Sequence, residues 1–281
     1  MDGTLLNSMG EISDTNLNAI KRAIDMGVEF AIVTGRPYIS VKKILDANKL
    51  SCFVIGCNGA QVTDKDGKLV KAHYINEESV SKIIKKADDI NIYYQLYNDF
   101  YIYTKSRLKL VGMLKNYSKK SIKRHISIRR MLKGMKRLFF TEVKVKRDLL
   151  KFASGKGKKF YKIQIASLNQ DRLNKMKDEL KSIPDIIVTS SAYYNMEIGP
   201  KGVTKGTAVK ELAQMYNIPK EDIIAMGDNF NDISMIEYAG CGVAMENAES
   251  AVKDKANFQT KSNDDNGVAF AIEKLVLGQR E

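Results

Sequence analysis

Residues 223–232, IIAMGDNFND, decide the fold of this chain, because a short apolar strand runs directly into a loop of carboxylates and amides. Such a strand is typical of a parallel sheet, where ligands bind beyond the carboxyl ends of the strands. The spacing of apolar residues predicts helices on both sides, over residues 204–216 and 233–238. We therefore expect an α/β fold with Asp228 at a ligand-binding edge.

The same alternation of helix and strand fills the first third of the chain and resumes near its C-terminus. The predicted elements are strands over 28–33, 52–55 and 241–245, a helix capped by Ser13, a hairpin around Asp66-Gly67 and a closing helix over 266–277. Alternating helices and strands predict a parallel sheet with helices on its faces.

Residues 77–185 break this alternation. Strand-like pieces over 92–96 and 100–103 are close neighbours in the sequence, which favours antiparallel pairing. A further alternating strand covers 160–165, and helices are predicted over 78–87 and 171–181. We interpret this stretch as an inserted α+β domain.

Length and composition limit the class of protein. The 281 residues are enough for two domains, and 44% hydrophobic and 28% charged residues are typical of a soluble globular protein. No apolar run approaches the roughly 20 residues that span a bilayer, and no signal segment is recognisable. Cys52, Cys57 and Cys241 lack CxxC spacing, which favours buried thiols in a reducing compartment. We expect a cytoplasmic protein with no membrane partner.

The net charge of +13 is concentrated in the middle of the chain. Between Lys105 and Lys162 there are 21 Lys and Arg residues against only Glu142 and Asp148, a balance of +19, which leaves −6 for the remainder. The simplest interpretation is a solvated helical face. A lid that steers anionic substrates is the first functional alternative.

Nucleic-acid binding through this basic stretch is the second functional alternative. No RRM, KH or zinc-finger signature accompanies the basic residues, so we do not expect a nucleic-acid partner. His73 and His125 are too few and too far apart for a histidine metal site.

Four polar segments fall at the ends of predicted strands or the starts of helices. They are Asp2-Gly3-Thr4, Thr34-Gly35-Arg36, the Lys205 region and residues 227–232. Each is weak alone, since Asp-Gly is a common turn and a single lysine is usually solvated. Their order, spacing and placement together indicate one site.

Together with Asn58-Gly59-Ala60 and residues 242–248 (GVAMENA), these segments make the chain resemble the haloacid dehalogenase-like superfamily, specifically the Cof-type phosphatases. The resemblance covers essentially the whole chain, although the middle matches only in length and pattern. It implies an α/β fold, a Rossmannoid parallel sheet core with an inserted α+β cap domain. We place the core at residues 1–78 and 188–281 and the cap at 79–187.

The resemblance implies a Mg²⁺ cofactor and hydrolysis of a phosphate ester through an aspartyl-phosphate intermediate. A carboxylate can attack the anionic phosphoryl group only if the charges of both are neutralised, which Mg²⁺ held by oxygen ligands does. The resemblance implies that the carboxylate of Asp228 binds the metal. Asn231 or Asp232 would support the metal or its water shell, and Asp2 would offer its backbone carbonyl.

The same resemblance assigns chemistry to three further groups. The Asp2 carboxyl would act as general acid to the leaving oxygen and then as base to the attacking water. Thr34 would bind phosphoryl oxygens through its hydroxyl and its backbone N–H. Lys205 would neutralise charge on the nucleophile and on the phosphate.

The resemblance implies that the remaining residues of the motifs bind the substrate. Gly35 would allow close approach of the phosphoryl group, and Asn58 and Gly59 would line the site near the cap. Arg36 has two open interpretations, a role at the site entrance and a structural ion pair.

The position that matches the family's nucleophile precedes Met1. Asp2 does not replace it, because a shift of one residue moves the carboxylate out of the line of attack. An apolar strand in the centre of the sheet should lead into that position, and its loss would expose two strand edges.

Three explanations are open for this mismatch. Met1 is an internal methionine and the protein begins about eight to ten residues upstream, or the protein is a shortened phospho-ligand binder, or it has no link to phosphate. The intact motifs favour the first, which an in-frame stop codon just upstream would contradict.

We therefore expect a Mg²⁺-dependent phosphatase that hydrolyses small phosphorylated metabolites of the sugar-phosphate or cofactor-phosphate type. The alternative is a catalytically inactive phospho-ligand or nucleic-acid binding protein. The residues of the cap choose the substrate, and sequence pattern alone does not identify it.

Overall fold

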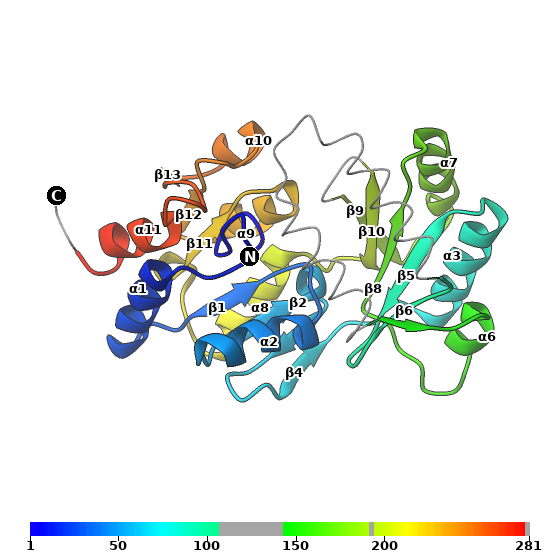
Figure 1. Cartoon of the computed structure of the whole chain (residues 1–281), viewed down its shortest axis with the longest axis horizontal. Helices are drawn as coiled ribbons and strands as arrows, with labels where there is room; N and C mark the ends of the chain where they lie inside the picture. Colours follow the sequence, from blue (N-terminus) through cyan, green and yellow to red (C-terminus); the bar gives the residue numbers. More distant parts are fainter. Residues whose placement is uncertain (107–142, 191–193, 279–281) are drawn as a thin grey trace. The chain divides into compact units, whose positions relative to one another are not determined.

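The structure is a computed structural model that describes residues 1–106, 143–190 and 194–278. The chain forms two compact units, one made of Met1–Lys71 with Thr204–Glu281 and the other of Ala72–Val203 (Figure 1). The inserted unit is wider than the predicted 79–187. Its first residues are tied to its interior, since the N–H of Ile75 donates to the carbonyl of Phe160 at 2.9 Å, and its last strand runs to Pro200.

The discontinuous unit contains two sheets. The first has the order β1 (Ala31–Val33), β2 (Phe53–Gly56), β3 (Gln61–Thr63) and β4 (Leu69–Ala72), and the second the order β11 (Ile224–Gly227), β12 (Cys241–Ala244) and β13 (Phe258–Gln259). The pairs β1–β2, β11–β12 and β12–β13 are parallel, whereas β2–β3 is antiparallel. The predicted parallel α/β arrangement is confirmed, with the parallel strands divided between two sheets.

Helices pack around these strands. They are α1 (Asp14–Asp25), α2 (Tyr38–Asn48), α8 (Lys205–Met215), α9 (Ile233–Tyr238), α10 (Ser250–Lys253) and α11 (Gly267–Leu275). Ser13 caps α1 as predicted, because its hydroxyl oxygen accepts the N–H of Asn16 at 3.1 Å. Helix α1 packs against α11, and buried residues of both belong to one apolar core, while α8 packs against α9.

The strands described in the inserted unit form one mixed sheet of order β7-β6-β5-β8-β10-β9. Its elements are α3 (Glu77–Asp89), β5 (Tyr93–Tyr97), β6 (Ile102–Thr104), β7 (Val143–Val145), α6 (Leu149–Ala153), β8 (Lys162–Ala166), α7 (Gln170–Leu180), β9 (Ile186–Thr189) and β10 (Asn195–Pro200). The predicted antiparallel pairing of β5 with β6 is confirmed. Apolar residues of the helices and of one sheet face form its core. This is an α+β domain.

The strongly basic stretch of the inserted unit falls largely at residues 107–142, outside the described residues, so its predicted roles are not addressed by the structure. Within the described parts of the chain, no helix combines the length and the apolarity that crossing a membrane requires.

Candidate functional site

The N-terminal loop contacts residues that follow strands of both sheets. Asp2 forms an ion pair with Arg36, which follows β1, and the Nε of Arg36 donates to Asp2 Oδ2 at 2.7 Å. Thr4 donates its hydroxyl to Oδ1 of Asp228, which follows β11, at 2.5 Å. The carboxyl ends of β1 and β11 therefore meet at this loop, as expected for a ligand site of an α/β sheet.

The acidic loop after β11 is organised by Asp232, whose side chain is buried beside that of Lys205. Lys205 Nζ donates to Asp232 Oδ1 at 2.5 Å. The other carboxylate oxygen accepts the backbone N–H groups of Asp228 and Asn229 at 3.0 Å each. Because both oxygens are engaged with the chain itself, Asp232 holds the loop and the lysine in place.

The pKa values of the two acidic residues of this loop are shifted in opposite directions. Burial raises the pKa of Asp228, and the nearby Asp232 raises it further, although the hydrogen bond from Thr4 opposes the change. Burial alone would also raise the pKa of Asp232. The ammonium groups of Lys205 and of Met1 outweigh that effect and hold the pKa of Asp232 below its ordinary value.

Asp232 is the carboxylate that pairs with Lys205. Asp228 is the carboxylate that a bound cation would help to ionise, because a positive charge beside it lowers its pKa.

The turn after β1 carries Thr34, Gly35 and Arg36. Thr34 is buried, its N–H donates to the carbonyl of Ile55 at 2.8 Å, and its Oγ1 accepts the N–H of Arg36 at 3.2 Å. These bonds fix the turn against β2 and direct Arg36 toward Asp2. Of the two interpretations of Arg36, the structure shows the ion pair.

The turn after β2 has an unusual backbone. Cys57 and Asn58 both have positive φ angles, 51° and 59°, in the left-handed region that side chains rarely adopt. The N–H of Asn58 donates to the carbonyl of Thr34 at 3.0 Å, and its Oδ1 accepts from Nδ2 of Asn231 at 3.1 Å. Asn58 therefore links the turn after β1 to the acidic loop. Strain held in this way is common at functional sites.

Gly59 completes this turn with a φ of 109° and packs against the start of α8. A Cβ at this position would lie 2.9 Å from the carbonyl carbon of Thr204, the residue that caps α8. The absence of a side chain lets α8 approach closely. Lys205, the first residue of the helix, is thereby placed next to the acidic loop.

The donor chemistry of the site suits Mg²⁺. Carboxylate and carbonyl oxygens are the ligands that this ion prefers, and Asp2, Asp228, Asn231 and Asp232 offer only such atoms and one amide nitrogen. In the described ranges, no three His, Cys, Asp or Glu side chains gather into a ready metal site. A metal would therefore need backbone or water oxygens besides the carboxylates.

Hydrogen bonds and ion pairs bring most of the predicted site residues together. Two residues that lie within the sequence motifs, Thr4 and Asn247, had no individual role assigned from the sequence. The Thr4 hydroxyl holds Asp228, and Asn247 Nδ2 donates to the carbonyl of Gly3 at 2.8 Å. Asn247 lies just beyond β12, so its place after a parallel strand was the available signal.

The lowered pKa of Asp232 predicts how stability depends on pH. Its ionised form stabilises the fold above the ordinary pKa of 3.8, and this contribution is lost as the pH falls through the lower pKa of the folded state. The difference in unfolding free energy between the wild type and Asp232→Asn should be constant from pH 7 to pH 5 and shrink at pH 3. Urea unfolding at these three values measures it, and an unchanged difference would contradict the assignment.

Comparisons with known proteins agree with this geometry. A model of the haloacid dehalogenase-like hydrolase family matches residues 1–272. The 5-amino-6-(5-phospho-D-ribitylamino)uracil phosphatase YwtE of Bacillus subtilis (strain 168) is 35% identical over 283 residues, covering 99% of this chain and 97% of the relative. Phosphatase YwpJ of the same organism is 31% identical over 280 residues, covering 98% of each.

A solved structure of a haloacid dehalogenase-like hydrolase from B. subtilis superposes with a TM-score of 0.87 at 30% identity. The superposition covers 98% of this chain and 97% of that one. The likeness therefore extends through both compact units.

Proposed function

Because this chain belongs to the haloacid dehalogenase-like hydrolases and is a phosphoric monoester hydrolase, we propose that it acts on small phosphorylated metabolites with Mg²⁺ as cofactor. The observation that carries the proposal is the buried Lys205–Asp232 pair, in which Asp232 also accepts the backbone N–H of Asp228 where β11 ends. A cation fixed beside carboxylates in a buried site is suited to a transferring phosphoryl group, whose charge is spread over three oxygens.

Each residue has a proposed task at this edge. The positive charge of Lys205 would neutralise charge on the phosphoryl group and on the nucleophile. Its ion pair with Asp232 keeps the ammonium group in one position. Thr34 offers its hydroxyl and backbone N–H to phosphoryl oxygens, with Gly35 leaving room for them. Asn58 and Gly59 complete the lining of the site.

Asp2 is the proposed general acid and base. Its side chain is half exposed and forms an ion pair with the guanidinium of Arg36. The carboxyl would donate a proton to the leaving oxygen of the substrate and later accept one from the attacking water. Arg36 acts by orienting this carboxylate, so we expect Arg36→Lys to impair activity less than Arg36→Ala.

Mg²⁺ would be held by the Asp228 carboxylate and the backbone carbonyl of Asp2, with Asn231 and Asp232 supporting its water shell. When bound, it supplies positive charge that stabilises the phosphoryl transition state. We propose that hydrolysis proceeds through an aspartyl-phosphate intermediate.

The name of one relative suggests a substrate to test first. The phosphatase YwtE is named for 5-amino-6-(5-phospho-D-ribitylamino)uracil, a sugar-alcohol phosphate that carries a uracil. We propose that the substrate of this protein belongs to the same broad class, a small polyol or cofactor phosphate.

Turnover of a substrate panel tests the proposal. The panel contains p-nitrophenyl phosphate, sugar phosphates and 5-amino-6-(5-phospho-D-ribitylamino)uracil, each with Mg²⁺ and with EDTA. The chain that begins at Met1 is compared with versions that carry an aspartate or an asparagine immediately before Met1, after an apolar lead. Activity is expected with Mg²⁺ and not with EDTA, and it should be highest for the aspartate version. Inactivity of that version on the whole panel would overturn the proposed function.

A further inference from the structure

The turn that follows β12, residues 245–249, contacts two loops of the candidate site. The backbone N–H of Glu249 donates to the carbonyl of Asp228 in the acidic loop at 3.2 Å. In the same turn, Nδ2 of Asn247 donates to the carbonyl of Gly3 in the N-terminal loop at 2.8 Å. One short segment therefore binds the backbone of both loops.

The side-chain amide of Asn247 has a single orientation, because both of its hydrogen bonds are made to backbone groups. The backbone N–H of Asn263 donates to Oδ1 of Asn247 at 3.0 Å. An N–H group only donates and a carbonyl only accepts, so Oδ1 faces Asn263 and Nδ2 faces Gly3. Asn263 donates its own Nδ2 to the carbonyl of Leu6 at 2.8 Å. The two asparagines thus hold two carbonyls of the N-terminal loop.

The carbonyl that Asn247 binds lies between two residues with proposed or observed roles at the site. Asp2, the proposed general acid and base, precedes Gly3. Thr4 follows Gly3 and donates its hydroxyl to Asp228 at 2.5 Å. Gly3 has a φ of 73°, and glycine restricts the backbone least of all residues. The hydrogen bond from Asn247 therefore fixes the peptide group after Gly3 and the directions of the residues on either side of it.

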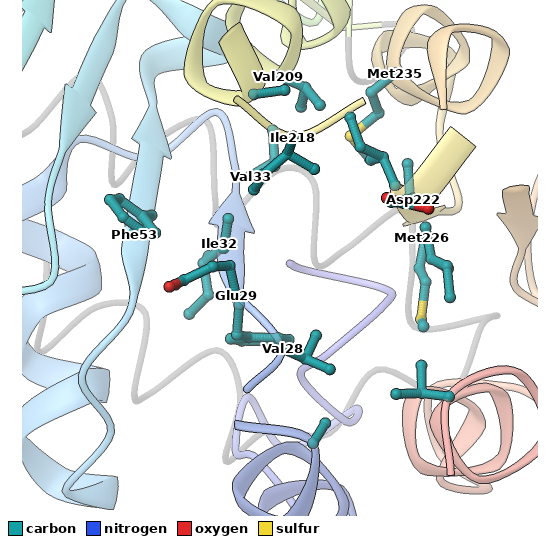
Figure 2. Close-up of a pocket in the computed structure, with 18 of the residues that line it drawn as sticks. Val28, Glu29, Ile32, Val33, Phe53, Val209, Ile218, Asp222, Met226 and Met235 are labelled. Atoms are coloured by element: carbon teal, nitrogen blue, oxygen red, sulfur yellow. The ribbon is translucent and has the colours of Figure 1, made fainter. Parts of the chain in front are cut away.

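Packing fixes the N-terminal loop less completely than these hydrogen bonds do. Thr4 and Leu5 line a cavity of about 820 Å³, whose other walls include Val33 and Met226 (Figure 2). Side chains that face a cavity have fewer packing partners. Asn247 does not line this cavity, and its side chain is exposed, so a substitution there leaves the cavity walls and the core intact.

We propose that Asn247 is a positioning residue, which sets the spacing between the carboxyl group of Asp2 and that of Asp228 by binding both of their loops to one turn. The catalytic consequence rests on the proposed function, whereas the link between the loops does not. A general acid and a metal carboxylate act on the same phosphoryl group, and a displacement of about 1 Å between such groups costs roughly 10²-fold in rate.

Asn247→Ala tests the proposal against a matched control. Asn48→Ala removes a bond of the same type, from Nδ2 to the backbone carbonyl of Ile44 at 2.8 Å, at the C-terminal end of α2. In the form of the protein that is most active on the substrate panel, Asn247→Ala should lower kcat about 10–100-fold and leave KM nearly unchanged. Asn48→Ala should change neither. Its urea unfolding midpoint should be at least as low as that of Asn247→Ala.

Two results of this comparison overturn the proposal. One is an unchanged kcat in Asn247→Ala. The other is a loss of activity no larger than the fraction of the variant that is unfolded under the assay conditions.

Asn247→Asp tests whether the donated hydrogen bond is the property that matters. The aspartate keeps an oxygen that accepts the N–H of Asn263, but at neutral pH it sets a carboxylate against the carbonyl of Gly3. Two acceptors repel each other, so kcat should fall at least as far as in Asn247→Ala. Wild-type activity of Asn247→Asp overturns the proposal.

Hydrogen exchange separates this inference from the proposed function. Asn247→Ala should speed the exchange of amides in residues 2–6 and 228–232 and leave those of residues 162–166 in the inserted unit unchanged. If even the wild type turns over no substrate of the panel, the proposed function fails and exchange alone judges the link. Faster exchange in both loops then supports the link, and unchanged exchange overturns it.

Discussion

Lys205→Met is expected to lose both activity and stability. The substitution leaves Asp232 buried without its cation, and breaking a buried ion pair from one side costs about 3–5 kcal/mol. Removal of a positioned charge from a site of this kind lowers kcat about 10²–10³-fold. Urea unfolding measures the first effect, and steady-state turnover of the most active form of the protein measures the second.

Two further variants make this result specific. Lys210→Met removes an exposed lysine from the same helix and should change neither quantity. In Lys205→Met/Asp232→Asn the buried negative charge is gone, so part of the stability should return while activity stays low. If Lys205→Met behaves like Lys210→Met, the buried pair contributes neither to stability nor to activity.

Gly3→Ala is expected to displace Asp228. Gly3 has a φ of 73°, and a Cβ there would lie 2.8 Å from Asp228 Cγ, too close for any side chain. A displacement of about 1 Å in a catalytic site costs roughly 10²-fold in rate. The left-handed backbone adds about 1–2 kcal/mol of strain for alanine. Turnover and unfolding free energy are the measurements.

The chain contains a matched control for this substitution. Gly10 has a φ of 78°, and no atom lies within 4 Å of the Cβ it would gain. Gly10→Ala should therefore carry the same backbone strain without any loss of activity. Equal activity of the two variants would show that Gly3 does not position Asp228.

Element types were predictable because they depend on local patterns. Helix α9 has the predicted limits Ile233–Tyr238, and Ser13 caps α1 as expected. The strand predicted over 28–33 was too long, since β1 begins at Ala31. Apolar character extends over the whole stretch, but hydrogen bonding to β2 covers only its end, and that depends on a partner distant in sequence.

The placement of the candidate residues at strand ends was predictable, and the hydrogen bonds among them were not. Strand ends marked Asp228, Thr34 and Arg36, because parallel strands bring their carboxyl ends to one edge. The sequence did not reveal that Asp232 has both oxygens occupied, by Lys205 and by backbone N–H groups. Nor did it reveal the Thr4 hydroxyl bond to Asp228.

Motif and periodicity alone thus established the α/β class, the inserted domain and the residues gathered at the strand ends. Tertiary structure decided that Asp232 pairs with Lys205 and that Asp228 accepts from Thr4, because pKa shifts and such contacts depend on burial and on neighbours far apart in the chain. It also decided that residues of β1 and β11 line one cavity. Which strand edges lie next to each other depends on residues far apart in the sequence, so a local sequence pattern does not predict it.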